Sequence, residues 1–484
     1  MAVLSGLKPE KVFEYFEELC KIPHGSGNTK EISDYLVTFA KERNLKVYQD
    51  EYNNVVIYKQ ASEGYESAPV TILQGHCDMV AEKTPESSHD FEKDGLKLMI
   101  EGDYITADQT TLGGDDGIAV AYMMAILDDD TLKHPALECV ITTDEEIGLL
   151  GAKDLDASVL QGKYMINLDS EEEGYLWISC AGGQTGLSEI PLSFQEVEGE
   201  VLEVVIDGLV GGHSGAEIDK NRANANKLMG RFLYELGQKV TFTLAELEGG
   251  TKDNAITRKC RAVLVLEEED RKTVEEFASS YQENLRKEYS GTDDHMTVHT
   301  VSQGTKTISA LDMMSKEKTV FFLMHVPYGI EKMSGEIEGL VETSNNIGVL
   351  RIEEGFLVSS CGIRSSVGSA KQFVSEKIQY LTEFLGGEYT VVGDYPAWEY
   401  KKDSTLRELM AGVYRDLFGK EPNVKAIHAG LECGLFYDKI PGLDCVSFGP
   451  SMQDIHTTEE KLSISSTARM WEYLVKVLES IKAS

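Results

Sequence analysis

The sequence has few features that would direct it to a membrane or to nucleic acid. No apolar run reaches the about 18 residues that a membrane-spanning helix requires. Residues 1–20 lack the basic start and apolar core of a secretory signal. Lys and Arg together number 46 against 82 Asp and Glu, so the net charge is −36. That acidity argues against nucleic acid and anionic membrane surfaces as partners.

Cysteine is too scattered to form a disulfide framework or a cysteine-based zinc site. There is no C-x-x-C pair, and the eight cysteines stand at positions 20, 77, 139, 180, 260, 361, 433 and 445. In a chain of 484 residues we expect reduced, buried thiols and a cytoplasmic protein. Cys77 stands between His76 and Asp78 in an extended segment, so its side chain is expected to point into the interior.

The length and the order of the patterns predict two domains. The first 185 residues alternate between helical spacing and short apolar runs. Helical patterns cover 9–20, 29–44 and 117–127, and strand-like runs cover 70–73, 137–143 and 164–168. Strands that alternate with helices predict an α/β fold with a mixed, mainly parallel sheet.

The middle of the chain has a different pattern. From about 186 it shows two successive sets of strand-like runs with helices, typical of two α+β units with antiparallel strands. A mixed pattern returns after "YPAWEY" at 395–400. We therefore expect one α/β domain from 1–186 and 390–484, interrupted by an inserted α+β domain at 187–389.

Several apolar runs in the α/β part end in histidine or carboxylate residues. The residues that follow them are His76 and Asp78; Asp144, Glu145 and Glu146; Asp169 and 171–173; and His456, while Asp115 and Asp116 precede a helix. Open α/β sheets bind ligands at the carboxyl ends of their strands, so these side chains are expected to converge. The alternative is a set of independent solvated turns, which are common in an acidic chain.

The residue types in this set indicate metal binding. Carboxylates gathered at one edge repel one another and raise each other's pKa unless a cation lies among them. Two histidines and several carboxylates, with no usable cysteine set, suit zinc or manganese. The set is too large for one tetrahedral ion and predicts two ions that share a bridging carboxylate, an arrangement that recurs in hydrolases.

Seven motifs then carry a family resemblance. They are "QGHCDMV", "TTLGGDDG", "DEEIGLLGA", "NLDSEEEG", "GGHSG", "DNAITR" and "HAGLECG", in this order. Together they resemble the co-catalytic di-zinc peptidase family that includes glutamate carboxypeptidase and aminoacylases, and within it the aminoacyl-histidine dipeptidase, or carnosinase-like, branch. The motifs and the last expected ligand span residues 74 to about 460, nearly the whole chain. The resemblance implies a zinc metallopeptidase whose inserted domain serves as a lid.

The resemblance assigns ligands for two Zn²⁺ ions per chain, with Mn²⁺ or Co²⁺ as substitutes. His76, Asp115 and Asp169 would hold one ion. Asp115, Glu146 and His456 would hold the other, so that Asp115 bridges the pair.

Two further carboxylates receive roles from the same resemblance. Glu145 matches the general base, which takes a proton from the attacking water. Asp78 matches the carboxylate that orients the His76 ring. The acids at 171–173 have no match and are expected to be solvated.

The chain departs from the branch pattern at two places. Asp116 stands where the branch often has Asn after the bridging residue. Thr457 and Thr458 stand where it often has Ser-Pro after the last histidine ligand. Neither change removes a ligand, so they bear on the fine geometry of the site.

Substrate-binding residues are assigned by motif as well. His213 would polarise the scissile carbonyl, and Arg364 would bind the substrate carboxylate. A structural hydrogen bond and a surface ion pair, respectively, are the plainer alternatives for these two residues. Asn254 is a further candidate, and Gly430 and Glu432 would line the pocket, with Glu432 near the substrate amine.

The function expected from this resemblance is hydrolysis of Xaa-His dipeptides such as β-Ala-His, so a small peptide is the expected partner. A broader di/tripeptidase or an N-acyl amino acid deacylase on the same scaffold is the alternative. A non-catalytic metal- or peptide-binding protein is disfavoured because it would need the ligands but not the base Glu145. The inserted domain is large for the family. It could place its own His213 over the metal site, or it could form a homodimer.

Overall fold

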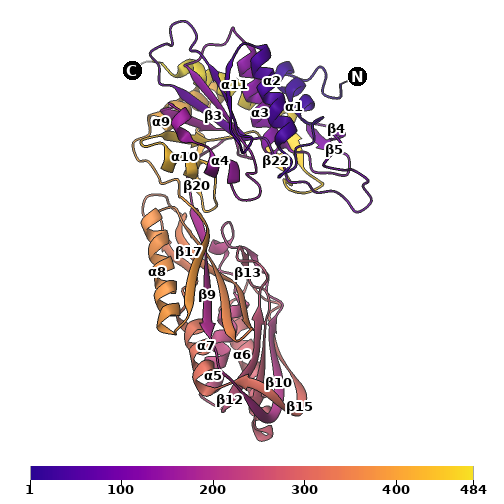
Figure 1. Ribbon diagram of the computed structural model, residues 1–484, viewed down its shortest axis with the longest axis vertical. Helices are drawn as coiled ribbons and strands as arrows, with labels where there is room; N and C mark the ends of the chain where they lie inside the picture. Colours follow the sequence, from indigo (N-terminus) through magenta and orange to yellow (C-terminus); the bar gives the residue numbers. More distant parts are fainter. Residues whose placement is uncertain (1, 483–484) are drawn as a thin grey trace. The chain divides into compact units, whose positions relative to one another are not determined.

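The computed structural model describes residues 2–482, which form two compact units (Figure 1). The first comprises residues 2–180, 400–426 and 431–482, and the second comprises 181–399 and 427–430. The second unit is therefore longer at both ends than the inserted domain expected at 187–389. The reason is that strands β9 (Gly182–Pro191) and β19 (Glu388–Tyr395) pair with each other and so belong to the second unit.

The first unit is built on a sheet of eight strands. Their order is β1 (Lys46–Gln49), β2 (Val55–Lys59), β6 (Leu137–Thr142), β3 (Thr71–His76), β7 (Tyr164–Asn167), β21 (Asp444–Ser447), β8 (Tyr175–Cys180) and β20 (Asn423–Ile427). The central strands β6, β3, β7 and β21 are parallel. Pairings β1–β2, β2–β6 and β21–β8 are antiparallel. The predicted mixed sheet is confirmed, and its parallel pairings lie at the centre.

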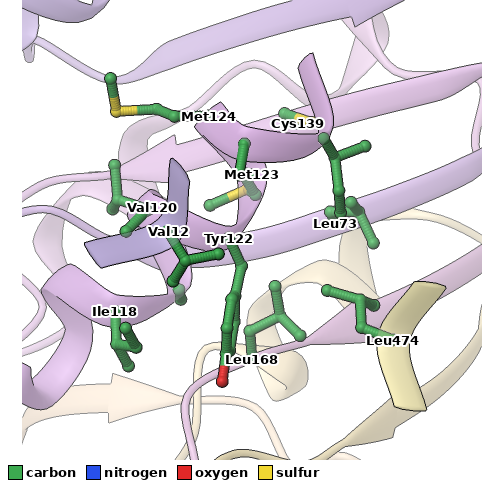
Figure 2. Packing of buried hydrophobic residues seen from close by; sticks show 14 of the residues in the cluster. Val12, Leu73, Ile118, Val120, Tyr122, Met123, Met124, Cys139, Leu168 and Leu474 are labelled. Atoms are coloured by element: carbon green, nitrogen blue, oxygen red, sulfur yellow. The ribbon is translucent and has the colours of Figure 1, made fainter. Parts of the chain in front are cut away.

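Helices enclose this sheet and bury its central strands. They are α1 (Glu10–Leu19), α2 (Lys30–Glu42), α3 (Gly114–Asp128), α4 (Leu150–Asp154), α9 (Thr405–Phe418), α10 (Cys433–Lys439) and α11 (Ile464–Ser480), with a 3₁₀ turn at Ala157–Val159. Helix α3 is buried from Gly114 to Leu127, as its continuous apolar run predicts. Figure 2 shows part of this core, with Val120 of α3, Val12 of α1 and Leu73 of β3 among its members.

A second, small sheet of the first unit joins distant parts of the chain. Its strand order is β22 (Met452–Gln453), β23 (Lys461–Ser463), β5 (Tyr104–Ala107) and β4 (Leu98–Glu101). Strand β5 leads to the loop before α3, and the connection from β22 to β23 carries His456. Pairing of β23 with β5 therefore fixes both loops to one support.

The second unit contains one antiparallel sheet. Its strand order is β15 (Thr297–Leu311), β10 (Phe194–Asp207), β14 (Cys260–Leu266), β12 (Phe242–Gly249), β17 (Val341–Glu353), β18 (Phe356–Ser365), β9 and β19, with β16 (Gly329–Met333) paired to β17. The helices are α5 (Ala225–Gly237), α6 (Arg271–Glu288), α7 (Met313–His325) and α8 (Gly368–Phe384), with 3₁₀ turns at Ile218–Lys220 and Glu268–Asp270. A separate ribbon pairs β11 (Gly212–His213) with β13 (Ala255–Ile256). The expected antiparallel α+β character is confirmed.

The two α+β sets of this unit share one sheet and one core. Strand β12 pairs with β17 at Glu248↔Arg351 and Gly249↔Leu350, which joins the sets. Leu202 and Val204 of β10 belong to the core that includes residues of all four helices, whereas Val201 belongs to a separate cluster. Since side chains alternate along a strand, the helices cover one face of the sheet.

Within residues 2–482, no helix has the length and apolar character needed to cross a membrane. All eight cysteines are free and buried, as expected. Cys77 is among them, and burial raises the pKa of its thiol.

The burial of β3 yields a stability prediction. Leu73 is fully buried in the core of the first unit, so Leu73→Ala should lower the free energy of unfolding by about 2–5 kcal/mol. Met99 on β4 is exposed, so Met99→Ala should change it by less than about 0.5 kcal/mol. Urea denaturation followed by circular dichroism compares the two variants, and equal losses would contradict this packing.

Candidate metal centre

The carboxyl ends of four neighbouring parallel strands carry the acidic and histidine residues of the first unit. His76 is the last residue of β3, and Glu145 and Glu146 follow β6. Asp169 follows β7, and His456 lies in the loop that continues from β21 through β22. Because these strands are adjacent and parallel, their ends meet at one edge of the sheet.

Asp115 lies at the centre of this group. Its Oδ1 is 3.2 Å from Nε2 of His76, which is also 3.8 Å from Oδ1 of Asp169. Its Oδ2 is 3.2 Å from Nε2 of His456, which is also 2.9 Å from Oε1 of Glu146. The two oxygens of one carboxylate thus face two imidazoles, each with a further carboxylate beside it. This arrangement has the form of a bridged pair of cation sites.

Four sets of potential ligand atoms lie within 4.8 Å of one another. They are His76, Asp116 and Asp169; His76, Glu145 and Glu146; Asp115, Glu146 and His456; and Asp115, Asp169 and Glu171. Glu171 was expected to be solvated, and that expectation is wrong. Its carboxyl is half-buried beside Asp115, and burial together with the Asp115 charge raises its pKa to about 7.

Asp78 fixes two elements of the group. Its Oδ1 is 3.4 Å from Nδ1 of His76, and its backbone carbonyl is 3.0 Å from the same atom. The ring therefore presents Nε2 to Asp115. Asp78 also accepts hydrogen bonds from the backbone N–H of Glu145 at 3.1 Å and from the hydroxyl of Ser26 at 2.8 Å. One buried carboxylate thus orients the histidine and the glutamate loop together.

The electrostatics of the group favour a bound cation. Burial raises the pKa of Glu145 to about 8, and the charges of Glu432 and Glu146 act in the same direction. Burial and the charge of Asp116 hold the pKa of Asp169 well above its usual value. Oδ1 of Asp116 is buried without a hydrogen-bond partner among the described residues. Nearby positive charge would favour the ionised carboxylates, and imidazole plus carboxylate donors suit Zn²⁺, Mn²⁺ or Co²⁺.

The second unit holds its own polar group around His213. Nδ1 of this histidine accepts hydrogen bonds from the backbone N–H of Gly215 at 3.3 Å and of Ala216 at 3.1 Å. Since Nδ1 accepts, Nε2 carries the hydrogen in the neutral ring. Burial, and then the charge of Arg364, lower the pKa of His213. The ring is therefore a neutral hydrogen-bond donor through Nε2.

Arg364 lies close to His213 within this unit. Its Nη1 donates a hydrogen bond to the Tyr395 hydroxyl at 3.0 Å. A Cβ atom added to Gly215 would lie 3.2 Å from Nε of Arg364, 3.0 Å from the His213 ring and 2.7 Å from the carbonyl of His428. Gly215 thus allows the neutral His213 ring, the Arg364 guanidinium and the His428 carbonyl to approach one another closely.

Three other predicted substrate residues have distinct environments. Asn254 is exposed, and its backbone carbonyl accepts a hydrogen bond from the backbone N–H of Ser214 at 2.8 Å. Gly430 lies against Tyr395, where a Cβ atom would be 2.7 Å from the ring. Glu432 is 0% exposed and accepts hydrogen bonds from Thr142 at 2.7 Å and from Gln74. The expected contact of Glu432 with a substrate amine is at odds with this interior position.

Comparison with known proteins agrees with the geometry. The cytosol non-specific dipeptidase of Escherichia coli (strain K12) is 35% identical over 485 residues, covering 100% of both chains. A family described as a peptidase dimerisation domain, from the M20 peptidases, matches residues 206–293. The chain belongs to the M20 peptidase family. The family resemblance of its motifs is thereby confirmed.

Solved structures of M20 peptidases share the fold. Aminoacylhistidine dipeptidase from Vibrio alginolyticus superposes with a TM-score of 0.94 at 35% identity, covering 99% of this chain and 98% of that one. Aminopeptidase PepT from Bacillus cereus superposes with a TM-score of 0.55 at 17% identity, covering 98% and 99%. This M20 peptidase therefore has the fold of its family over nearly its whole length.

The polar group of the second unit makes stability depend on pH. Burial and the charge of Arg364 lower the pKa of His428 to about 4. The pKa of a histidine in the unfolded chain is about 6.5. Between pH 6.5 and 4 the unfolded chain therefore binds more protons at this residue than the folded chain does. Stability should therefore fall as the pH drops through this range, by up to about 3 kcal/mol from this residue. His428→Asn should weaken the dependence in denaturation series at pH 7, 6, 5 and 4, and an unchanged slope would contradict the assignment.

Proposed function

We propose that this M20 peptidase is a zinc-dependent dipeptidase that hydrolyses Xaa-His dipeptides such as β-Ala-His. The observation that carries the proposal is the placement of the two Asp115 oxygens opposite His76 and His456, each with a second carboxylate. The substrate class is supported by the Vibrio alginolyticus relative, which is named an aminoacylhistidine dipeptidase.

The distances support the ligand assignment that the family resemblance implies. His76, Asp115 and Asp169 would hold one Zn²⁺, and Asp115, Glu146 and His456 the other, with Mn²⁺ or Co²⁺ as substitutes. Two such ions, when bound, supply Lewis-acid stabilisation of a carbonyl oxygen and increase the acidity of water. Asp78 keeps Nε2 of His76 directed at Asp115 by holding the opposite ring nitrogen.

Glu145 acts as the general base in this proposal. Its backbone N–H is held by Asp78 at 3.1 Å, and the crowded environment raises the pKa of its carboxyl. A carboxyl group with such a pKa can accept a proton and return it near neutral pH. Glu145 takes a proton from the attacking water and passes it to the leaving amine nitrogen.

Substrate recognition is assigned to the second unit. Nε2–H of His213 donates a hydrogen bond to the scissile carbonyl oxygen, because the backbone N–H groups of Gly215 and Ala216 fix the ring in that tautomer. The Arg364 guanidinium binds the substrate carboxylate. The Tyr395 hydroxyl accepts a hydrogen bond from this guanidinium and so keeps it in place. Asn254 adds an exposed amide for the substrate backbone, and Gly430 lines the pocket where its lack of a side chain lets the Tyr395 ring pack against it.

A broader specificity is the second candidate. The Escherichia coli relative, 35% identical over the whole chain, is named a non-specific dipeptidase. A peptidase that binds only the backbone and the C-terminal carboxylate of its substrate would accept many dipeptides and some tripeptides. A deacylase of N-acyl amino acids would differ because its substrates lack a free amine.

We propose the cytoplasm as the compartment of this peptidase. The Escherichia coli relative is named a cytosol enzyme. The eight cysteines are free and buried, which is usual for thiols in a reducing compartment.

Replacing the base should separate catalysis from metal binding. Glu145→Gln should retain both ions and lower kcat for β-Ala-His by about 10²–10⁴-fold, because the amide cannot accept the proton. Glu172 is an exposed glutamate of the same edge, so Glu172→Gln is the matched control and should keep wild-type activity. Metal content by mass spectrometry and hydrolysis rates test both variants.

The outcomes of that comparison separate the candidates. Equal activity of wild type and Glu145→Gln would remove Glu145 as the base. Wild-type hydrolysis of many dipeptides at similar kcat/KM would favour the broader peptidase. Preference for N-acyl amino acids over dipeptides with a free amine would favour the deacylase.

We also propose that the second unit forms a homodimer through an apolar helical surface. The α7–α8 patch consists of Met313, Met314, Phe321, Met324, Phe373, Tyr380 and Phe384, and five of these are 62–74% exposed. Monomeric proteins rarely expose several large apolar side chains on one contiguous surface. A second copy is the proposed occupant because the dimerisation-domain match includes α5, whose Tyr234 lines a hollow of about 470 Å³ in this patch. Protruding and hollowed parts on one surface suit a two-fold symmetric contact.

Charge placed on the patch should dissociate the dimer. Tyr380 and Phe384 are both more than 70% exposed, so the double variant Tyr380→Glu/Phe384→Glu should be monomeric in sedimentation experiments and remain folded. Val301 on β15 is exposed outside the patch, so Val301→Glu should leave the oligomeric state unchanged. A wild-type monomer, or a dimer that survives the double variant, would overturn this surface.

A further inference from the structure

Glu460 is a buried carboxylate that the metal-ligand set does not include. It lies four residues after His456 and immediately before β23, and its exposure is 3%. Its Oε2 accepts hydrogen bonds from the backbone N–H of Leu112 at 2.8 Å and of Gly113 at 3.1 Å. Its Oε1 accepts from the N–H of Gly114 at 2.8 Å and of Asp115 at 3.4 Å. Four consecutive backbone donors thus converge on one side chain.

These donors need a partner from outside their own helix. They precede or begin α3, where backbone N–H groups lack intrahelical acceptors. The residue before the helix is Gly113, whose left-handed φ of 68° is suited to glycine, and it has no side chain to cap the donors. A carboxylate at this end also complements the helix dipole. Glu460, 345 residues away from Asp115 in the sequence, fills this role.

The same side chain joins the loops of two proposed ligands. One loop leads from β5 to Asp115, and the other leads from β22 through His456 to β23. Strand β23 pairs with β5, so the two loops begin from a common support. Glu460, directly before β23, adds a second connection, from the end of the His456 loop to the backbone N–H of Asp115, whose carboxylate faces His456.

We propose that Glu460 is a positioning residue of the metal centre, which holds the Asp115 backbone so that its carboxylate faces both histidines. This inference rests on the proposed function in one respect, that Asp115 and His456 bind cations. Without the two acceptor oxygens of Glu460, the Leu112–Asp115 backbone is less restrained. The Asp115 carboxylate then samples a wider range of orientations. Both cation sites weaken together because they share Asp115.

The sequence offers a matched pair of variants. Glu460→Gln keeps the shape but places an amide N–H₂ against two of the four backbone donors. Glu459 is the adjacent exposed glutamate, so Glu459→Gln removes the same charge without touching the loop. Glu460→Asp keeps the charge on a shorter side chain and serves as the conservative variant.

Metal affinity is the decisive measurement, because a cap that only stabilises the helix would not change it in the folded protein. Metal-free variants are titrated with Zn²⁺ against a chelator of known affinity at pH 7. We expect Glu460→Gln to bind both ions about 10–100-fold more weakly and Glu459→Gln to bind within about twofold of wild type. Glu460→Asp should be intermediate, and excess Zn²⁺ should restore much of the activity of Glu460→Gln.

The outcomes distinguish this inference from the proposed function. If Glu460→Gln folds and binds Zn²⁺ with wild-type affinity, the positioning role is overturned. The same holds if this variant loses only thermal stability. Should Glu460→Gln fail to fold, wild-type affinity of Glu460→Asp would overturn it in the same way. A wild-type protein that binds fewer than two ions would instead overturn the proposed metal centre.

Discussion

The first unit is organised around carboxylates that cannot all ionise next to one another in the absence of positive charge. Asp115 shares its two oxygens between His76 and His456, while Asp169 and Glu146 complete the two sides. Burial raises the pKa values of Glu145 and Asp169, so these two carboxyl groups favour the neutral form in the absence of nearby positive charge. Such an arrangement persists in a folded protein when it serves a cation, and the rest of the unit can be understood as its support.

That support comes from several buried or paired elements. The fully buried helix α3 packs within the same core as α1 and β3, so its N-terminus has a fixed position beside the strand ends. The small sheet fixes the loops before Asp115 and after His456. Asp78 holds the His76 ring and the Glu145 backbone, and Glu460 holds the backbone of the Asp115 loop. Sites on regular elements with buried partners keep their geometry within the small tolerance that catalysis needs.

The second unit supplies a different chemistry from a different architecture. Its antiparallel sheet merges two α+β sets through β12 and β17, and a short ribbon carries His213. Burial and Arg364 keep this histidine neutral, and two backbone N–H groups fix its tautomer. The first unit thus gathers negative charge for cations, whereas the second gathers neutral and cationic hydrogen-bond donors suited to carbonyl and carboxylate oxygens.

The sequence by itself determined the fold class, the family and the residues that end the strands. Apolar runs of strand length followed by His76, Glu146 and Asp169 predict a ligand edge, because strand ends in an α/β sheet point to one place. Tertiary structure alone decided the roles of acids without a local pattern. Glu171 lies beside Asp115, Glu432 is enclosed, and Glu460 binds a backbone 345 residues away, yet each stands in a polar stretch of ordinary appearance. Burial and hydrogen bonding of a carboxylate depend on what packs against it from distant parts of the chain, and local sequence carries no record of that contact.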